Sequence, residues 1–205
     1  MYYNNLADFY KNKFGVRLAK LAFNGGFTCP NRVNGARGCI FCTGSGENTG
    51  SASLSLYEQF LREVQVVKNK WPQAKYIAYF GSFTNTFDSV SNLKKRFEEV
   101  LTFPDVVGLS IGTRCDSISD ECFEYLCDLN KRTYLTVELG LQSSFDNTLK
   151  YINRGHDIAS FDNMVKKLKE ANINVVVHII DGLPNETEDM MLETIRHLNK
   201  LHIDG

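Results

Sequence analysis

The stretch from Cys29 to Cys42 reads CPNRVNGARGCIFC, and it decides how the rest of the chain is interpreted. Its three cysteines, Cys29, Cys39 and Cys42, are separated first by nine residues and then by two. A two-residue gap lets neighbouring thiolates converge on one metal centre, and the longer, glycine-containing arm can fold back to deliver another. The only charged residues of the stretch are Arg32 and Arg37, and positive neighbours favour the thiolate form that binds metal. The spacing therefore predicts a metal-cluster loop.

Three cysteines leave one coordination position of a metal centre open. A structural zinc site uses four protein ligands, but no second CxxC lies nearby and no His occurs in the next hundred residues. On a 4Fe-4S cluster, which four cysteines normally hold, three cysteines leave one iron free to bind a small molecule. The spacing favours such a cluster. A zinc knuckle with a distant ligand, and a disulfide with one free thiol, are the alternatives.

Length and composition limit the class of protein. The chain has 205 residues, of which 43% are hydrophobic, so it is long enough for one substantial core. The formal net charge is -1, and no run of Lys or Arg marks a nucleic-acid surface. No apolar run approaches the roughly 20 residues that cross a bilayer, so we expect no membrane partner. Six cysteines in a chain of this length, without a signal peptide, favour the reducing cytoplasm over a secreted disulfide scaffold.

Short β-like runs alternate with helical periods from Arg17 onward. The expected strands are residues 18–24, 76–81, 106–112, 134–141 and 174–182. Apolar residues recur at helical spacing over residues 56–67, 90–100, 122–129, 161–168 and 192–198. Five consecutive βα units predict an α/β fold with a parallel sheet and helices on its outside, after a partly helical lead-in over residues 1–16. An open doubly wound sheet and part of a β/α barrel both fit this periodicity.

The carboxyl ends of the expected strands carry unusual residues, and ligands of parallel β/α folds bind at these ends. The second strand runs into Gly81 and Ser82, where glycine permits close backbone approach and serine offers a hydrogen bond. A polar turn is the alternative there. The third strand ends in Thr113 and Arg114, and the guanidinium can reach a carboxylate or a phosphate.

The fourth and fifth strands carry ionisable residues within apolar runs. Alternation places Glu138, Gly140 and Gln142 on one face of the fourth strand. A carboxylate in a buried strand needs a partner, which is either a ligand or a structural ion pair. His178 in the fifth strand has the alternative of being a satisfied core histidine. The three cysteines outside the loop are expected to be small buried hydrophobes: Cys115, Cys122 and Cys127.

The stretch from Cys29 to Cys42 resembles the cluster loop of radical S-adenosylmethionine (SAM) enzymes, in the variant whose first spacing is nine residues. Phe41 fits the aromatic residue usual before the last cysteine. This variant is similar to that of the YhcC/YtqA-like proteins, which are related to the catalytic subunit of Elongator. Three later matches follow in order: a Gly-x-Gln-Ser strand end at residues 140–143, an Asn-Arg-Gly-His turn at 153–156, and Asp-Gly-Leu-Pro at 181–184.

The resemblance implies a partial (β/α) radical SAM barrel over residues 17–205, with five βα units visible and the sixth strand absent from this chain. It implies that Cys29, Cys39 and Cys42 bind a 4Fe-4S cluster whose free iron binds SAM. The residues expected to contact SAM are Gly81, Ser82, Thr113, Glu138, Gln142, Arg154 and His178. Among these, the matching positions imply that Gln142 and His178 contact the ribose and that Arg154 pairs with the carboxylate.

The function implied by this resemblance is reductive cleavage of SAM to a 5′-deoxyadenosyl radical. Acid-base groups are optional in such chemistry, so no catalytic residue is named. The Elongator subunit acts on wobble uridines of transfer RNA, which makes tRNA the leading substrate. Radical modification of a small metabolite or a peptide is one alternative, and a non-enzymatic zinc-binding α/β module is another. An electron donor such as flavodoxin or ferredoxin is an expected partner.

Overall fold

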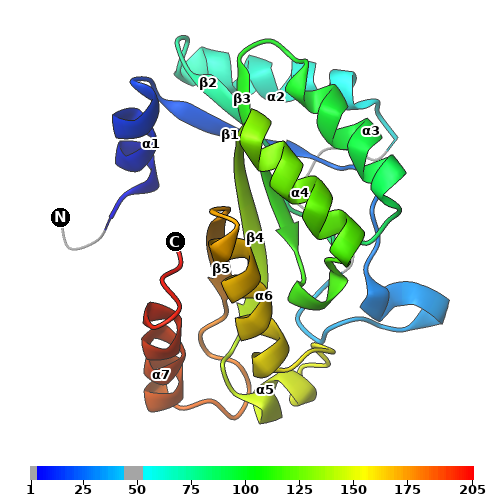
Figure 1. The fold of residues 1–205 in the computed structure, drawn as a ribbon, viewed down its shortest axis with the longest axis vertical. Coiled ribbons are helices and arrows are strands. Elements are labelled where there is room, and N and C mark those ends of the chain that lie inside the picture. The colour runs from blue at the N-terminus through cyan, green and yellow to red at the C-terminus, as the bar shows by residue number, and fades with distance from the viewer. Residues whose placement is uncertain (1–3, 44–52) are drawn as a thin grey trace.

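The computed structural model describes residues 4–43 and 53–205, and in this part of the chain five strands alternate with helices (Figure 1). The strands are β1 (Leu18–Phe23), β2 (Lys75–Phe80), β3 (Val106–Thr113), β4 (Tyr134–Gln142) and β5 (Asn174–Ile179). The helices are α1 (Leu6–Phe14), α2 (Leu56–Lys70), α3 (Val90–Leu101), α4 (Asp120–Arg132), α5 (Asp146–Tyr151), α6 (Ile158–Glu170) and α7 (Glu188–Asn199), with 3-10 turns η1 (Pro30–Gly35) and η2 (Cys115–Ser117). All five predicted strands and the five predicted helical periods are confirmed.

Side-chain caps define where the helices after the strands begin. A side chain at the N-cap accepts a hydrogen bond from a first-turn backbone N–H at Ser55, Ser89, Ser119, Asp157 and Thr187. Helix α5 was not predicted. It is only six residues long, too short for a helical period to stand out, and it is held by the packing of Leu149 and Ile152 against Leu183.

The strand order in the sheet is β1-β2-β3-β4-β5, and every neighbouring pair is parallel. Helices α2, α3, α4 and α6 pack on strands β1, β3, β4 and β5 along one face of the sheet (Figure 1). A doubly wound sheet reverses its strand order and carries helices on both faces. The observed order does not reverse, so the fold is the partial β/α barrel. The backbone of residues 204–205 hydrogen-bonds to Val175 and Val177 alongside β5, at 2.8 and 2.9 Å.

The two faces of the sheet differ in chemistry. Residues on the outer face, such as Leu21, Phe80 and Val137, are fully buried in the core under the helices. The intervening positions point to the inner, concave face, where β-strand alternation places the polar side chains. These inner-face residues are Lys20, Tyr79, Ser110, Glu138 and His178. The inner face can therefore serve as the wall of a polar site.

Helix α1 lies at the amino ends of the strands. Its Tyr10 is buried and forms a small apolar cluster with Leu18 and Ile77, and its ring lies edge-on to Tyr134 at a centroid distance of 6.2 Å. This confirms a partly helical lead-in for the residues that the structure describes. Within the same ranges, none of the helices combines the length and apolar character needed to span a bilayer.

Candidate functional site

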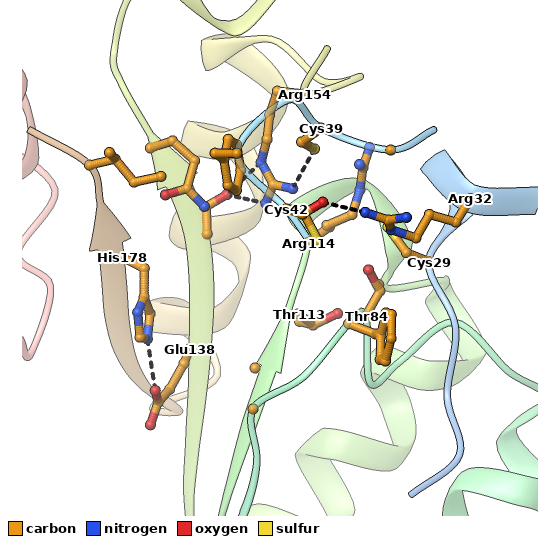
Figure 2. Close-up of a pocket in the computed structure, with 18 of the residues that line it drawn as sticks. Cys29, Arg32, Cys39, Cys42, Thr84, Thr113, Arg114, Glu138, Arg154 and His178 are labelled. Carbon is orange, nitrogen blue, oxygen red and sulfur yellow. Dashed lines mark hydrogen bonds and ion pairs between the residues drawn. The ribbon is translucent and has the colours of Figure 1, made fainter. Parts of the chain in front are cut away.

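A cavity of about 370 Å³ opens at the carboxyl ends of the strands, beneath the cysteine loop (Figure 2). Its volume is in the range of pockets that hold small molecules. The predicted site residues that line it are Cys29, Cys39, Cys42, Gly81, Thr113, Glu138, Gln142, Arg154 and His178. Ser82 is the one predicted contact that is not part of its lining. Residues far apart in the sequence, from the loop and from strands β2 to β5, thus meet at one place.

The cysteine loop folds back on itself through two specific contacts. Gly38 has a left-handed φ of 81°, and a Cβ there would lie 2.9 Å from the Arg32 guanidinium. The Arg32 side chain donates a hydrogen bond to the carbonyl of Cys42 (Figure 2). The Cys42 N–H donates to the Cys39 carbonyl at 3.1 Å, which forms the turn between the last two cysteines. Gly38 and Arg32 therefore shape the loop that presents the thiols.

The turn after α5 holds the loop in place. The side-chain amide of Asn31 donates to the carbonyls of Asn153 and Arg154, at 2.7 and 3.0 Å, and lies 3.3 Å from the Cys39 sulfur. In return, the Asn153 side chain donates to the Gly38 carbonyl at 2.8 Å. These contacts explain why an Asn-Arg-Gly-His turn far along the sequence belongs to the cysteine site. Asn31 was not among the predicted site residues.

Two buried arginines face the thiols. Arg154 is 6% exposed, donates to the Gly140 carbonyl and lies 4.0 Å from the Cys39 sulfur (Figure 2). Burial, followed by the nearby charge of Arg114, lowers the pKa of Arg154, yet a guanidinium remains protonated. Arg114 forms an ion pair with Asp116 at 2.6 Å, and its Nη1 has no hydrogen-bond partner among the described residues.

The unpaired Nη1 of Arg114 is the observation that shows whether this site suits a cluster with bound SAM. The Arg114 side chain is 3% exposed, and it interacts electrostatically with the sulfurs of Cys29 and Cys39. An unpaired buried N–H is costly unless a partner completes it. Cluster sulfides and a ligand carboxylate are both negative acceptors, so two buried guanidiniums beside three cysteines suit this pair of groups. The sequence indicated an anion contact for Arg114, but the residue was not among the predicted SAM contacts.

Strand β4 ends in a bulge that aims its last side chain. The β4–β5 register shifts between Gly140 and Gln142, and Gln142 adopts a left-handed φ of 79°. Bulges and such backbone conformations are common beside functional sites, because they re-aim a side chain. A Cβ on Gly140 would lie 2.7 Å from Arg154 Nη2 and 2.8 Å from Gln142 Nε2. Gly140 thus leaves room for both predicted SAM contacts.

The rim between β2 and β3 is held by buried polar side chains. Asn85 donates to the carbonyls of Phe80 and Gly112, at 3.0 and 2.7 Å, where the strand ladder ends. The hydroxyls of Thr86 and Thr113 are 2.6 Å apart. The Asn85 bonds satisfy carbonyls that the end of the sheet leaves open, and the Thr86 hydroxyl holds Thr113 at the cavity wall.

Glu138 lies at the bottom of the cavity, with its side chain 1% exposed. It accepts hydrogen bonds from Lys20, Ser110 and the His178 ring, the last at 2.8 Å (Figure 2). Burial alone would raise its pKa, but the hydrogen bonds from His178 and Lys20, the Lys20 charge and the Ser110 hydroxyl outweigh burial and lower the pKa to about 2. The ion pair, one of the two alternatives for Glu138, is therefore present. Lys20 was missed, although it occupies an inner-face position in an alternating strand.

The three cysteines outside the loop lie in a more apolar environment than the loop cysteines. Cys115 and Cys122 lie in the hydrophobic core, and burial raises the pKa of each thiol to about 12. Cys127 is half-buried and packs against the same core. The prediction of buried hydrophobic cysteines is confirmed for Cys115 and Cys122.

Across residues 4–43 and 53–205, no three His, Cys, Asp or Glu side chains form a group that could hold a single metal ion. The thiolates of a 4Fe-4S cluster bind different irons of a wider centre. All three loop cysteines lie in the wall of one cavity, with Cys39 buried and Cys42 exposed. The assignment of the three as cluster ligands stays a prediction.

Comparison with known proteins places these observations in a family. The model described as the Radical SAM superfamily matches residues 26–198. The protein YtqA of Bacillus subtilis is 44% identical over 99% of this chain and 64% of its own length. The protein YhcC of Escherichia coli is 34% identical over 94% of this chain and 63% of its own length. This chain therefore spans a little under two thirds of each relative.

This chain is also similar, at lower identity or over a shorter stretch, to proteins whose names state an activity or a complex. A tRNA uridine(34) acetyltransferase of Methanocaldococcus infernus is 31% identical over 41% of this chain and 15% of its own length. Among solved structures, coproporphyrinogen III oxidase of E. coli superposes with a TM-score of 0.60 and 16% identity, covering 92% of this chain and 43% of the other. The archaeal Elp3 of M. infernus gives a TM-score of 0.58 and 21% identity, covering 69% of this chain and 37% of the other. At such identities the structural likeness concerns the fold alone.

Proposed function

Because this chain belongs to the radical SAM superfamily, we propose that it holds a 4Fe-4S cluster through Cys29, Cys39 and Cys42 and cleaves SAM reductively. When bound, the cluster would supply the electron that converts SAM to methionine and a 5′-deoxyadenosyl radical, which abstracts a hydrogen atom from the substrate. The observation that carries the proposal is the joint placement of the three cysteines and two buried arginines around one cavity. The hard chemistry comes from the cofactors, and the chain supplies binding and orientation.

The chain's own residues have separable tasks in this proposal. Arg154 and Arg114 would neutralise the anionic groups gathered at the cysteines, since both guanidiniums are buried beside them. Gln142, aimed by the β4 bulge, and His178 would bind the ribose of SAM. Gly81 would let the methionyl amino group approach the backbone at the end of β2. Holding the radical carbon close to one substrate hydrogen and excluding water is the remaining task of the cavity walls.

Anaerobic reconstitution with iron and sulfide tests this proposal. We expect about four irons per chain, a broad brown absorbance, and a change in the spectrum when SAM is added, because one iron is open. Reduction with dithionite should then release 5′-deoxyadenosine, measured by chromatography. A colourless protein with bound zinc and no response to SAM would contradict the proposal and favour the zinc-binding alternative.

For the substrate we propose tRNA, with modification at a wobble uridine. The support is the name of one relative, a tRNA uridine(34) acetyltransferase, together with the likeness of the cysteine loop to that of the Elongator subunit. The test compares two transcripts of one tRNA that differ only in U34 or C34, with mass spectrometry of the digested RNA. We expect SAM cleavage to be stimulated, and a mass change to occur, only with the U34 transcript. Equal SAM cleavage with both transcripts and without RNA would favour a small-metabolite or peptide substrate.

The electron donor and the compartment belong to the same proposal. We propose a carrier such as flavodoxin or ferredoxin, which would approach the outer side of the loop, where Ile40 and Cys42 are exposed. A reducing cytoplasm agrees with the free thiols at all six cysteines.

A further inference from the structure

The Glu138 carboxylate hydrogen-bonds to side chains of β1, β3 and β5 and acts electrostatically on one of β2. Lys20 of β1 and Ser110 of β3 donate to Oε1, and His178 of β5 approaches Oε2 with Nε2 at 2.8 Å. Burial, followed by the nearby Glu138 charge, raises the pKa of Tyr79 on β2 to about 12. The two carboxylate oxygens thus have different tasks, because one is held by the anchoring donors and the other faces the histidine.

The protonation state of Glu138 determines which nitrogen of His178 carries the proton. With its pKa lowered to about 2 by hydrogen bonds that outweigh burial, the carboxylate is ionised at neutral pH and can only accept hydrogen bonds. The group 2.8 Å from Oε2 must therefore donate, so His178 Nε2 carries a proton. A neutral imidazole has one N–H, and this arrangement leaves Nδ1 as a hydrogen-bond acceptor.

His178 does not need Glu138 in order to satisfy a buried ring. Half of its side chain is exposed, and it lines the cavity that also contains the cysteines. Glu138, by contrast, is buried and already has Lys20 and Ser110 as partners on Oε1. The second oxygen therefore orients the ring at the cavity wall, which is a common role for a carboxylate behind a functional histidine.

We propose that Glu138 is a positioning residue, anchored by Lys20 and Ser110, that fixes His178 in the Nε2–H tautomer so that Nδ1 accepts a hydrogen bond from a ribose hydroxyl of SAM. This inference rests on the proposed function. It differs from the prediction that Glu138 itself contacts SAM, because the carboxylate acts through the imidazole.

The tautomer can be measured without cluster or ligand. In cluster-free protein labelled with ¹⁵N-histidine, long-range ¹H–¹⁵N correlations at pH 8.5 should assign His178 as Nε2–H. In Glu138→Gln, Lys20 and Ser110 should retain the amide oxygen, so the amide N–H would face the ring and switch His178 to Nδ1–H. His197 is an internal reference, because its Nε2 lies 2.8 Å from Asp162 and should stay Nε2–H in both proteins. An Nδ1–H tautomer in the wild type, or no change in Glu138→Gln, would overturn the proposal.

The route through His178 is tested by a double-mutant cycle on SAM affinity of the reconstituted protein. We expect Glu138→Gln to weaken SAM binding about tenfold in the wild-type background, the size of one hydrogen bond, and to have little effect in a His178→Ala background. An equal loss in both backgrounds would mean that Glu138 acts independently of the histidine, and would refute the inference. Glu121→Gln, an exposed change on α4, is the matched control and should bind SAM as the wild type does. If the wild type itself bound no SAM, the proposed function would fail, while the NMR assignment would still decide whether Glu138 fixes the tautomer.

Discussion

At the scale of single residues, environment separates cysteines that share the same chemistry. Cys122 is 1% exposed in an apolar core, where burial raises the pKa of its thiol to about 12. Cys39 is also buried, but Asn31 and Arg154 direct N–H groups toward its sulfur. Cys39 thus has polar hydrogen-bond donors around its sulfur, whereas the apolar core around Cys122 disfavours the thiolate. Burial alone would not distinguish these two cysteines.

Substituting each of these cysteines provides a matched pair. We expect Cys39→Ala to lose the reconstituted cluster, because two thiolates do not retain it, and Cys122→Ala to bind iron as the wild type does. The measurement is iron per chain and absorbance after anaerobic reconstitution, with circular dichroism to confirm folding. Equal loss of iron from both variants would show that the division between ligands and core cysteines is wrong.

At Gly140, we expect an added methyl group to weaken ligand binding more than it lowers the stability of the fold. A Cβ at this position would lie within 2.8 Å of the ends of Arg154 and Gln142, which are flexible side chains that can move aside. We expect Gly140→Ala to keep its thermal unfolding midpoint within a few degrees but to weaken SAM binding tenfold or more, because both contacts are displaced. Isothermal titration of the reconstituted variant measures this effect. Wild-type affinity would remove Arg154 and Gln142 from the proposed SAM site.

At the scale of elements, helix α2 shows how local sequence sets a boundary. The Ser55 hydroxyl accepts from the Glu58 N–H at 3.2 Å, and the Glu58 carboxylate accepts from the Ser55 N–H at 2.8 Å, which forms a capping box. This local pair of side-chain and backbone bonds therefore fixes the start of α2 at Leu56.

Loss of this cap should have a measurable cost. We expect Ser55→Ala to lower the free energy of unfolding by about 1 kcal/mol, because first-turn N–H groups lose their partner. Ser91→Ala is the control: this residue is exposed in the first turn of α3, whose N-cap is Ser89, so the change should be nearly neutral. Urea unfolding of the cluster-free proteins measures both. A similar cost at the two positions would contradict a specific role for the cap.

Periodicity in the sequence predicted the strands and long helices, because their apolar residues repeat over many positions. It did not predict α5, which has six residues and no repeat, or the strand order, which depends on packing between distant segments. For the site, the cysteine spacing, the strand ends and the resemblance to radical SAM enzymes together indicated nine residues that do meet at one cavity. Lys20 and Asn31 were missed because each acts on a residue more than a hundred positions away, respectively Glu138 and the Asn153 turn, and a single sequence does not reveal such pairs.

At the scale of the whole molecule, the Glu138 carboxylate links side chains of several strands across the inner face of the barrel. Side chains from four strands converge on Glu138, and this residue lines both the cysteine cavity and a second cavity of about 630 Å³ at the amino ends of the strands. The ion pair with Lys20 therefore forms the partition between the two ends of the barrel interior. A buried carboxylate of this kind links stability of the fold to pH.

The sign of that linkage follows from the lowered pKa. The folded-state pKa of Glu138 is about 2, below the ordinary value of 4.5, so its ionised form stabilises the fold above pH 4.5 and this contribution is lost as the pH falls towards 2. The contribution is on the order of 3 to 4 kcal/mol at most, since each pKa unit corresponds to about 1.4 kcal/mol. Glu138→Gln cannot ionise and lacks this term. We therefore expect the difference in unfolding free energy between wild type and variant to be largest at pH 6 to 7 and to shrink steadily below pH 4.5.

Urea unfolding of cluster-free wild type and Glu138→Gln at pH 7, 5 and 3.5 measures this difference, with Glu121→Gln as an exposed control whose curve should run parallel to the wild type. A difference that stayed constant across this range would mean that Glu138 is not the ionised partner of Lys20 in the fold. A neutral Glu138 could donate a hydrogen bond as well as accept one, and the Nε2–H tautomer of His178 would then no longer be required. The stability of the whole barrel and the orientation of one imidazole at its site thus depend on the same charge, and one pH series tests both.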